Sequence, residues 1–172
     1  QALLQPLLAH LNGFAPAINL AGRQRMLSQK ITKSALALMI APEAEAGVHQ
    51  AELQFALADW GRVHRALSIG DVELQLSPVE QPAIVAALQE LEPSFARLQS
   101  AARAALTQGV PESAAAAETL LATAGEYLQR MDHIVSLYEQ EAERKVTRLR
   151  ILSACASGMI VGLLVALGRF VL

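Results

Sequence analysis

One short stretch of the sequence, NLAGRQRMLSQKITK at positions 19–33, has the residue types to bind a small anion. It holds four cations, whereas no Asp or Glu occurs before residue 43. Like charges three or four positions apart on a helix repel one another, so the stretch needs a negative partner from elsewhere. That partner is either an acidic side chain or a bound anion. The four cations are Arg23, Arg25, Lys30 and Lys33.

The spacing of this stretch favours an anion held between two copies of the chain. On a helix, steps of three and four place Gly22, Arg25 and Gln29 on one face, and Gly22 has no side chain to keep a second helix away. Where two such helices cross on a two-fold axis, the two Arg25 guanidinium groups face each other, which is unfavourable unless an anion lies between them. A guanidinium offers a planar fork of donors that suits a small oxyanion. We therefore predict one anion site per homodimer.

A simpler interpretation stays open from charge alone. The cations of residues 19–33 could form a solvated face, or they could pair with acidic residues of the last predicted helix. The residues after position 42 hold ten cations and sixteen anions, so acidic partners are available. Candidates are Asp132, Glu139, Glu141 and Glu143.

No other residues form a recognisable reactive site. The sequence contains no paired carboxylates, no Ser/His/Asp or Cys/His arrangement and no glycine-rich phosphate loop, so we predict no catalytic residues and no enzyme activity. His64 lies on an apolar helical stripe, where a core or interface histidine is more common than a metal ligand. We expect no metal site and no cofactor. A net charge of −2 argues against general nucleic-acid binding.

The elements that must position Arg25 are helices. The composition is 53% hydrophobic but only 4% aromatic, which favours helices packed through aliphatic side chains over a β-sandwich. Apolar residues recur in alternating steps of three and four in four segments, which predicts an all-α antiparallel four-helix bundle, up-down-up-down, over residues 1–150. The helices are predicted at about 17–40, 44–67, 83–107 and from 111 onward.

Two details of these helices follow from particular residues. Pro93 should kink the third helix, because its ring removes a donor and crowds the preceding turn. The fourth helix should bury one apolar stripe against the others. Its predicted members are Leu121, Ala124, Leu128, Met131, Val135, Tyr138 and Ala142.

The fourth helix continues into a long apolar run. The eighteen residues from Ile151 to Gly168 carry no charge, so residues 151–172 are predicted to form a transmembrane helix. Small residues recur at every fourth position within it, a pattern that lets two membrane helices pack closely. They are Ala154, Gly158, Gly162 and Ala166. The alternative is a C-terminal core helix of the bundle.

The residues on either side of the predicted bundle bear on its location. The basic residues between positions 144 and 150 would place the bundle in the cytoplasm by the positive-inside tendency. The chain begins at Gln1 without an initiator Met and ends almost as soon as the apolar run does. We therefore expect a piece of a longer polypeptide, with a signal or membrane segment before Gln1 and further residues after Leu172.

The stretch NLAGRQRMLSQKITK closely resembles the opening motif of PilJ/NarX-like sensor domains, which comprise the type IV pili methyl-accepting chemotaxis transducer N-terminal family and the related nitrate/nitrite sensor kinases. The segments LADWGRVHRAL, at 57–67, and MDHIVSLYEQEAE, at 131–143, are similar to later parts of the family. Leu20 and Lys30 stand where the kinases carry a basic residue and an arginine. These departures favour the chemoreceptor version of the motif.

The resemblance implies a periplasmic four-helix bundle that dimerises along its first helix and binds nitrate, in some members also nitrite, at the dimer interface. Arg25, directly before the Met of the motif, matches the anion-binding arginine, and Gly22, Arg23 and Gln24 match the rest of the pocket wall. We therefore expect the ligand-binding domain of a bacterial inner-membrane receptor that signals through its transmembrane helix. The alternative is a membrane-anchored helical module that only dimerises or binds a partner. An output kinase or cyclase would lie outside this chain.

Overall fold

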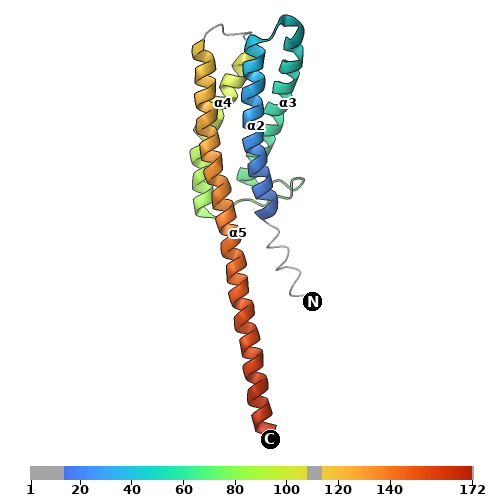
Figure 1. Ribbon diagram of the computed structural model, residues 1–172, viewed down its shortest axis with the longest axis vertical. Helices are drawn as coiled ribbons and strands as arrows, with labels where there is room; N and C mark the ends of the chain where they lie inside the picture. The colour runs from blue at the N-terminus through green and yellow to red at the C-terminus, as the bar shows by residue number, and fades with distance from the viewer. Residues whose placement is uncertain (1–13, 108–113, 172) are drawn as a thin grey trace.

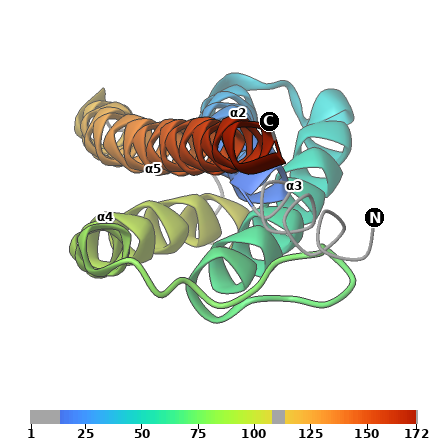
Figure 2. The same ribbon diagram turned by 90° about the horizontal axis from the view of Figure 1, so that it is seen from below.

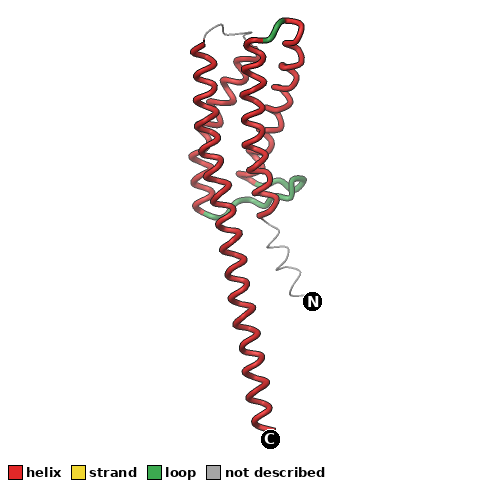
Figure 3. The backbone as a smooth tube through the Cα atoms, viewed as in Figure 1, coloured by secondary structure: helices red, strands yellow, loops and turns green. Residues whose placement is uncertain are grey.

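Four helices make up the described part of the chain: α2 (Phe14–Ile40), α3 (Glu43–Ile69), α4 (Pro82–Thr107) and α5 (Ala114–Val171). The computed structural model describes the backbone of residues 14–107 and 114–171, and the side chains of these residues except 114, 115, 161 and 163–171. In Figure 1, α2, α3, α4 and the first part of α5 lie side by side, and α5 continues beyond the others. Figure 3 shows the longer connection between α3 and α4 as a green loop at the end of the bundle from which α5 emerges.

Consecutive helices run in opposite directions, and α2 lies between α3 and α5. The most extensive packing is between α2 and α3, between α2 and α5, and between α4 and α5. The view from below in Figure 2 shows the same arrangement, with α2 beside both α5 and α3. The predicted all-α four-helix bundle is therefore confirmed, and the predicted helix positions agree with the observed ones to within a few residues.

Aromatic side chains from three helices stack in the middle of the core. The ring of Phe95 on α4 lies between two rings of α3, with its centroid 4.2 Å from that of Trp60 and 3.7 Å from that of His64. Tyr127 of α5 meets Trp60 edge to face at 5.0 Å. Trp60 and Tyr127 are fully buried and His64 is 6% exposed. The prediction that His64 is a core residue is confirmed.

The buried face of α5 differs from the predicted stripe in its first half. In this half, the predicted residues Leu121, Ala124 and Leu128 are not fully buried, and Leu121 is 53% exposed; at the far end of the stripe Ala142 is also only partly buried. The buried positions there are Leu120, Thr123 and Tyr127. From Met131 to Tyr138 the predicted stripe is correct. The error arose because this part of α5 is apolar on two faces, so steps of three and four fit either one.

Helix α4 continues as one helix through Pro93. Proline has no backbone N–H, so the carbonyl four residues earlier loses its usual donor. Beside this point, Arg130 of α5 donates from Nη1 to the backbone carbonyl of Glu90 at 3.1 Å. A side chain of the neighbouring helix thus bonds to the backbone close to the proline.

The loop from Gly70 to Gln81 has a defined structure at the end of the bundle. Asp71 and Leu76 exchange two backbone hydrogen bonds of 2.8 and 2.9 Å, and Leu76 is buried. Gly70 has a φ of +84°, and a Cβ there would lie 2.9 Å from the Cδ of Pro78. The loop therefore requires glycine at its first residue, for both its backbone conformation and the space.

The predicted transmembrane helix finds no support in the described residues. Among those residues, no helix is both long enough and apolar enough to cross a membrane. Of the predicted span, the side chains of residues 161 and 163–172 lie outside the described ones.

Gly70→Ala should lower the free energy of unfolding by about 1–3 kcal/mol, because alanine is strained at this positive φ and its methyl group would press on Pro78. Chemical denaturation measures the change. The matched control is Gly47→Ala in α3, where a Cβ would meet no atom within 4 Å. That substitution should be neutral or stabilise the fold by up to about 1 kcal/mol. Equal effects of the two substitutions would contradict the role of Gly70.

Burial lowers the pKa of His64 below its ordinary value of 6.5, although the hydrogen bond to Glu92 partly opposes this shift. The folded protein therefore binds fewer protons at His64 than the unfolded chain does. Its free energy of unfolding should fall as the pH drops through 6.5, by at most about 1.4 kcal/mol per pH unit. His64→Gln should reduce this slope, whereas His133→Gln, at an exposed position, should not. If the pH dependence of the free energy of unfolding were unchanged in His64→Gln, it would not arise from His64.

Candidate functional site

Arg23 and Arg25 each have an acidic partner on a neighbouring helix. Arg23 Nη2 donates to Asp59 Oδ2 of α3 at 2.6 Å, and Arg25 Nε is paired with Asp132 Oδ1 of α5. Part of the positive charge of residues 19–33 is thus neutralised within one chain. For Arg25, the partner is one of the acids that the simpler interpretation of the sequence named.

The pair of Arg25 and Asp132 is open to solvent. The Arg25 side chain is 44% exposed and the Asp132 side chain 49% exposed. Water screens the attraction between such groups, so an exposed ion pair stabilises a fold by only about 0–1 kcal/mol. An anion from solution can therefore compete with the Asp132 carboxylate for the guanidinium.

The face of α2 that was predicted to meet a second helix is open at Gly22, as far as the described residues show. A Cβ at Gly22 would find no atom within 4 Å. Arg25 and Gln29, one and two turns further along, are both exposed, and Met26 beside them is 55% exposed. Gly22 and Arg25 therefore lie on one accessible surface, as their spacing predicted.

An apolar groove continues this surface between α2 and α5. It begins at Ser28 and Gln29, one turn beyond Arg25, and has a volume of about 580 Å³. Its apolar walls contain the α5 residues that the sequence had placed inside the bundle. They are Leu36, Ala37 and Ile40 from α2, and Leu121, Ala124 and Leu128 from α5. The second apolar face of α5 is thus exposed next to the Arg25 surface.

Gln24, which was also predicted to belong to the anion site, points into the bundle. Its side chain is fully buried. Gln24 Nε2 donates to the backbone carbonyl of Trp60 at 2.7 Å, and Gln24 Oε1 accepts from the Tyr127 hydroxyl at 2.7 Å. Trp60 Nε1 donates to the same Tyr127 oxygen at 3.1 Å. The Gln24 amide therefore joins α2, α3 and α5, and it does not share the Arg25 surface.

Two residues with a part in this region were missed in the sequence. Asp59 neutralises Arg23, and Tyr127 completes the buried network of Gln24. Tyr127 could have been found, because it lies four residues before Met131 and seven before Ile134 on one helical face. Asp59 carries no comparable signal, since its pairing depends on how α2 and α3 are aligned.

The other predicted residues are dispersed or lie outside the described part. Lys30 and Lys33 are exposed on α2. Ala154, Gly158 and Gly162 are exposed on α5, and the side chain of Ala166 lies outside the described residues. Within the described ranges, no three His, Cys, Asp or Glu residues gather in a way that could hold a metal ion.

Comparison with known proteins finds one matching family profile and a similar solved structure. The family profile described as "Type IV pili methyl-accepting chemotaxis transducer N-term" matches residues 7–120. Among solved structures, the chain is similar to the ligand-binding domain of the P. aeruginosa nitrate receptor McpN, with 29% sequence identity and a TM-score of 0.63. The similarity covers 74% of this chain and 97% of that one. No curated protein matches the chain.

Tyr127→Phe should lower the free energy of unfolding by about 1–3 kcal/mol, because it leaves the buried Gln24 oxygen and the Trp60 Nε1 donor without their partner. Tyr138→Phe is the matched control. Tyr138 is only 2% exposed, but its hydroxyl has no hydrogen-bond partner in the described structure. Removing that hydroxyl should leave stability unchanged or raise it. Thermal and chemical denaturation of the two variants test the difference, and an equal loss in both would contradict it.

Proposed function

Because the chain belongs to the type IV pili methyl-accepting chemotaxis transducer N-terminal family, we propose that it is the sensor domain of a bacterial inner-membrane chemoreceptor that binds nitrate, or a similar small oxyanion, in the periplasm. The similarity to the ligand-binding domain of a nitrate receptor supports nitrate as the ligand. The observation that carries the proposal is the half-exposed Arg25 guanidinium on an open face of α2.

The site is completed by a second copy of the chain. Gly22 leaves room for a second α2 beside Arg25, and the apolar groove between α2 and α5 continues the same surface. Met26, Ile40 and Leu121 are exposed by 55%, 85% and 53% along this side. A homodimer would cover these apolar side chains and bring two Arg25 groups to one anion. The dry surroundings of that interface would strengthen the charge-assisted hydrogen bonds.

Ligand binding would act on α5 through Asp132. In the single chain, Asp132 holds Arg25 and thereby links α5 to α2. A nitrate ion between two arginines would take the place of the two carboxylates and release this link. The ligand shifts the equilibrium only by its differential affinity for the two arrangements. The released α5, together with residues 151–168 as its membrane segment, would carry the signal.

The alternative function is a helical module that dimerises without sensing an anion. One observation favours it: Arg25 and Arg23 already have carboxylate partners, so neither arginine requires an anion to balance its charge. Both functions predict a dimer through α2. Only the sensor requires nitrate to bind at Arg25.

Calorimetric titration of the 172-residue chain with nitrate tests the proposal. Arg25→Ala should weaken binding at least about tenfold, since a hydrogen bond to a charged group is worth about 1.5–3 kcal/mol. Asp132→Asn should tighten binding up to about thirtyfold, because each nitrate displaces two Asp132 carboxylates, each worth at most about 1 kcal/mol. Asp59→Asn, which frees Arg23 instead, is the matched control and should change little.

The panel of anions includes nitrite, sulfate, phosphate and chloride, and sedimentation measures the oligomeric state in parallel. A dimer that binds none of these anions would favour the non-sensing module. Nitrate binding that is unaffected by Arg25→Ala would refute the site.

A further inference from the structure

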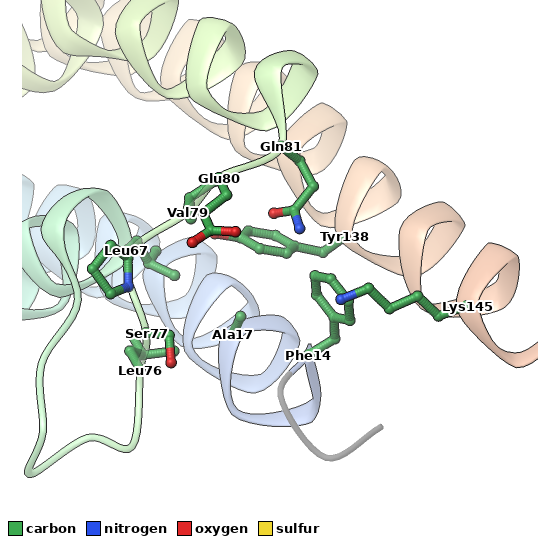
Figure 4. A pocket seen from close by; sticks show the side chains of 11 residues that line it. Phe14, Ala17, Leu67, Leu76, Ser77, Val79, Glu80, Gln81, Tyr138 and Lys145 are labelled. Carbon is green, nitrogen blue, oxygen red and sulfur yellow. The ribbon is translucent and has the colours of Figure 1, made fainter. Parts of the chain in front are cut away.

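A second pocket lies at the other end of the bundle, where α5 leaves the remaining helices. The start of α2, the end of α3, the segment 76–81 and α5 surround it, and its volume is about 260 Å³. Figure 4 shows side chains from all four parts of the chain turned toward this space. We call it the basal pocket. It is far from the predicted anion site, because Phe14 and Arg25 are about 16 Å apart along α2 at 1.5 Å per residue.

The walls of the basal pocket are mostly apolar and firmly held. Phe14, Leu67 and Leu76 are each at least nine-tenths buried, and Val79 is half-buried. The loop that supplies Leu76 is closed by its two hydrogen bonds with Asp71. The pocket is therefore formed by the folded chain itself. A small aliphatic group would be well accommodated against these walls.

Tyr138 supplies a polar group without a partner. Its ring lines the pocket and its side chain is 2% exposed, yet its hydroxyl makes no hydrogen bond within the described structure. A buried hydroxyl without a partner is unfavourable, and native proteins retain few of them. Burial also raises the pKa of Tyr138 to about 12, so the group stays a neutral donor at physiological pH. A bound molecule with an acceptor would satisfy it.

Two charges of opposite sign flank the same space. Lys145 of α5 lines the pocket with its Nζ 4.2 Å from the centroid of the Phe14 ring, and Glu80 lines it from the segment before α4. Neither residue forms an ion pair with any residue that the structure describes. Figure 4 shows Glu80 and Gln81 on one side of Tyr138 and Lys145 on the other. The charged lining is therefore formally neutral but polarised.

We propose that the basal pocket binds a small zwitterion with an aliphatic side chain, that is, an aliphatic α-amino acid. Its carboxylate would accept hydrogen bonds from Lys145 and the Tyr138 hydroxyl. Its ammonium group would donate to the Glu80 carboxylate and the Gln81 side-chain oxygen. Its aliphatic side chain would pack on Leu67, Leu76 and Val79. A zwitterion complements both the Lys145 ammonium and the Glu80 carboxylate, whereas an ion of a single sign would meet one like charge in the same space.

Calorimetry of the 172-residue chain with L-leucine as the probe tests this site. Two analogues separate the charges: 4-methylpentanoate lacks the ammonium group and 3-methylbutylamine lacks the carboxylate. We expect L-leucine to bind saturably, and each analogue to bind at least tenfold more weakly. Equal affinity for 4-methylpentanoate would overturn the zwitterion assignment. No saturable binding of L-leucine, L-valine or L-isoleucine would overturn the site.

Variants assign the binding to named residues. Tyr138→Phe and Lys145→Met should each weaken L-leucine binding at least tenfold, and Lys33→Met, an exposed cation elsewhere on the bundle, is the matched control. Both variants should fold, because the Tyr138 hydroxyl has no hydrogen-bond partner in the described structure and Lys145 lies at the edge of the fold. Unchanged L-leucine binding in both variants would refute the assignment. Nitrate titration of Tyr138→Phe and Lys145→Met separates the two sites. Both variants should bind nitrate as the unsubstituted chain does, because neither residue belongs to the Arg25 site.

Discussion

Gln24 fixes how α2 is rotated in the bundle. Its amide bonds to the Trp60 carbonyl on α3 and to the Tyr127 hydroxyl on α5. Any other rotation of α2 would bury the Gln24 amide without hydrogen bonds or leave the Tyr127 hydroxyl without its acceptor, at a cost of about 1–3 kcal/mol for the unsatisfied group. Successive helical residues lie about 100° apart, because a turn has 3.6 residues. With Gln24 inside, Gly22 and Arg25 must lie outside. Gln24, although it is fully buried, therefore determines that Arg25 is accessible on the surface of α2.

The helices were predictable because their apolar residues repeat with the period of a helix, and each proline or glycine at a boundary ends or begins one. The register of α5 was harder, because its first half is apolar on two faces. Only the packed structure shows that Leu120 and Tyr127 face inward while Leu121 lines a groove beside α2. The second apolar face, which seemed to be part of the core, lies at the surface beside α2 and is only partly buried.

The candidate anion site was partly predictable, because helical spacing alone shows which residues of α2 share a face. The spacing of Gly22 and Arg25 fixed their common face without any knowledge of the other helices. Gln24 was assigned to the same site from the resemblance to the sensor family, and the resemblance does not reveal that its side chain points into the bundle. The partners Asp59 and Asp132 depend on the alignment of α2 with α3 and α5. Several acidic residues of the last helix were possible partners for the arginines on the basis of charge. The packing of the helices determines which of them forms an ion pair.

Helix α5 has no proline or glycine between Glu126 and Ser157, and it runs without a break from Ala114 to Val171. Tyr138, the last large side chain that α5 buries among those that the structure describes, marks where it leaves the bundle. Asp132 lies about 9 Å from Tyr138 along the helix, and Val171 about 50 Å beyond it, at 1.5 Å per residue. A straight α5 that pivots at Tyr138 is a lever whose two arms have lengths in a ratio of about one to five. A sideways shift of about 1 Å at Asp132 would move its far end by about 5 Å in the opposite direction.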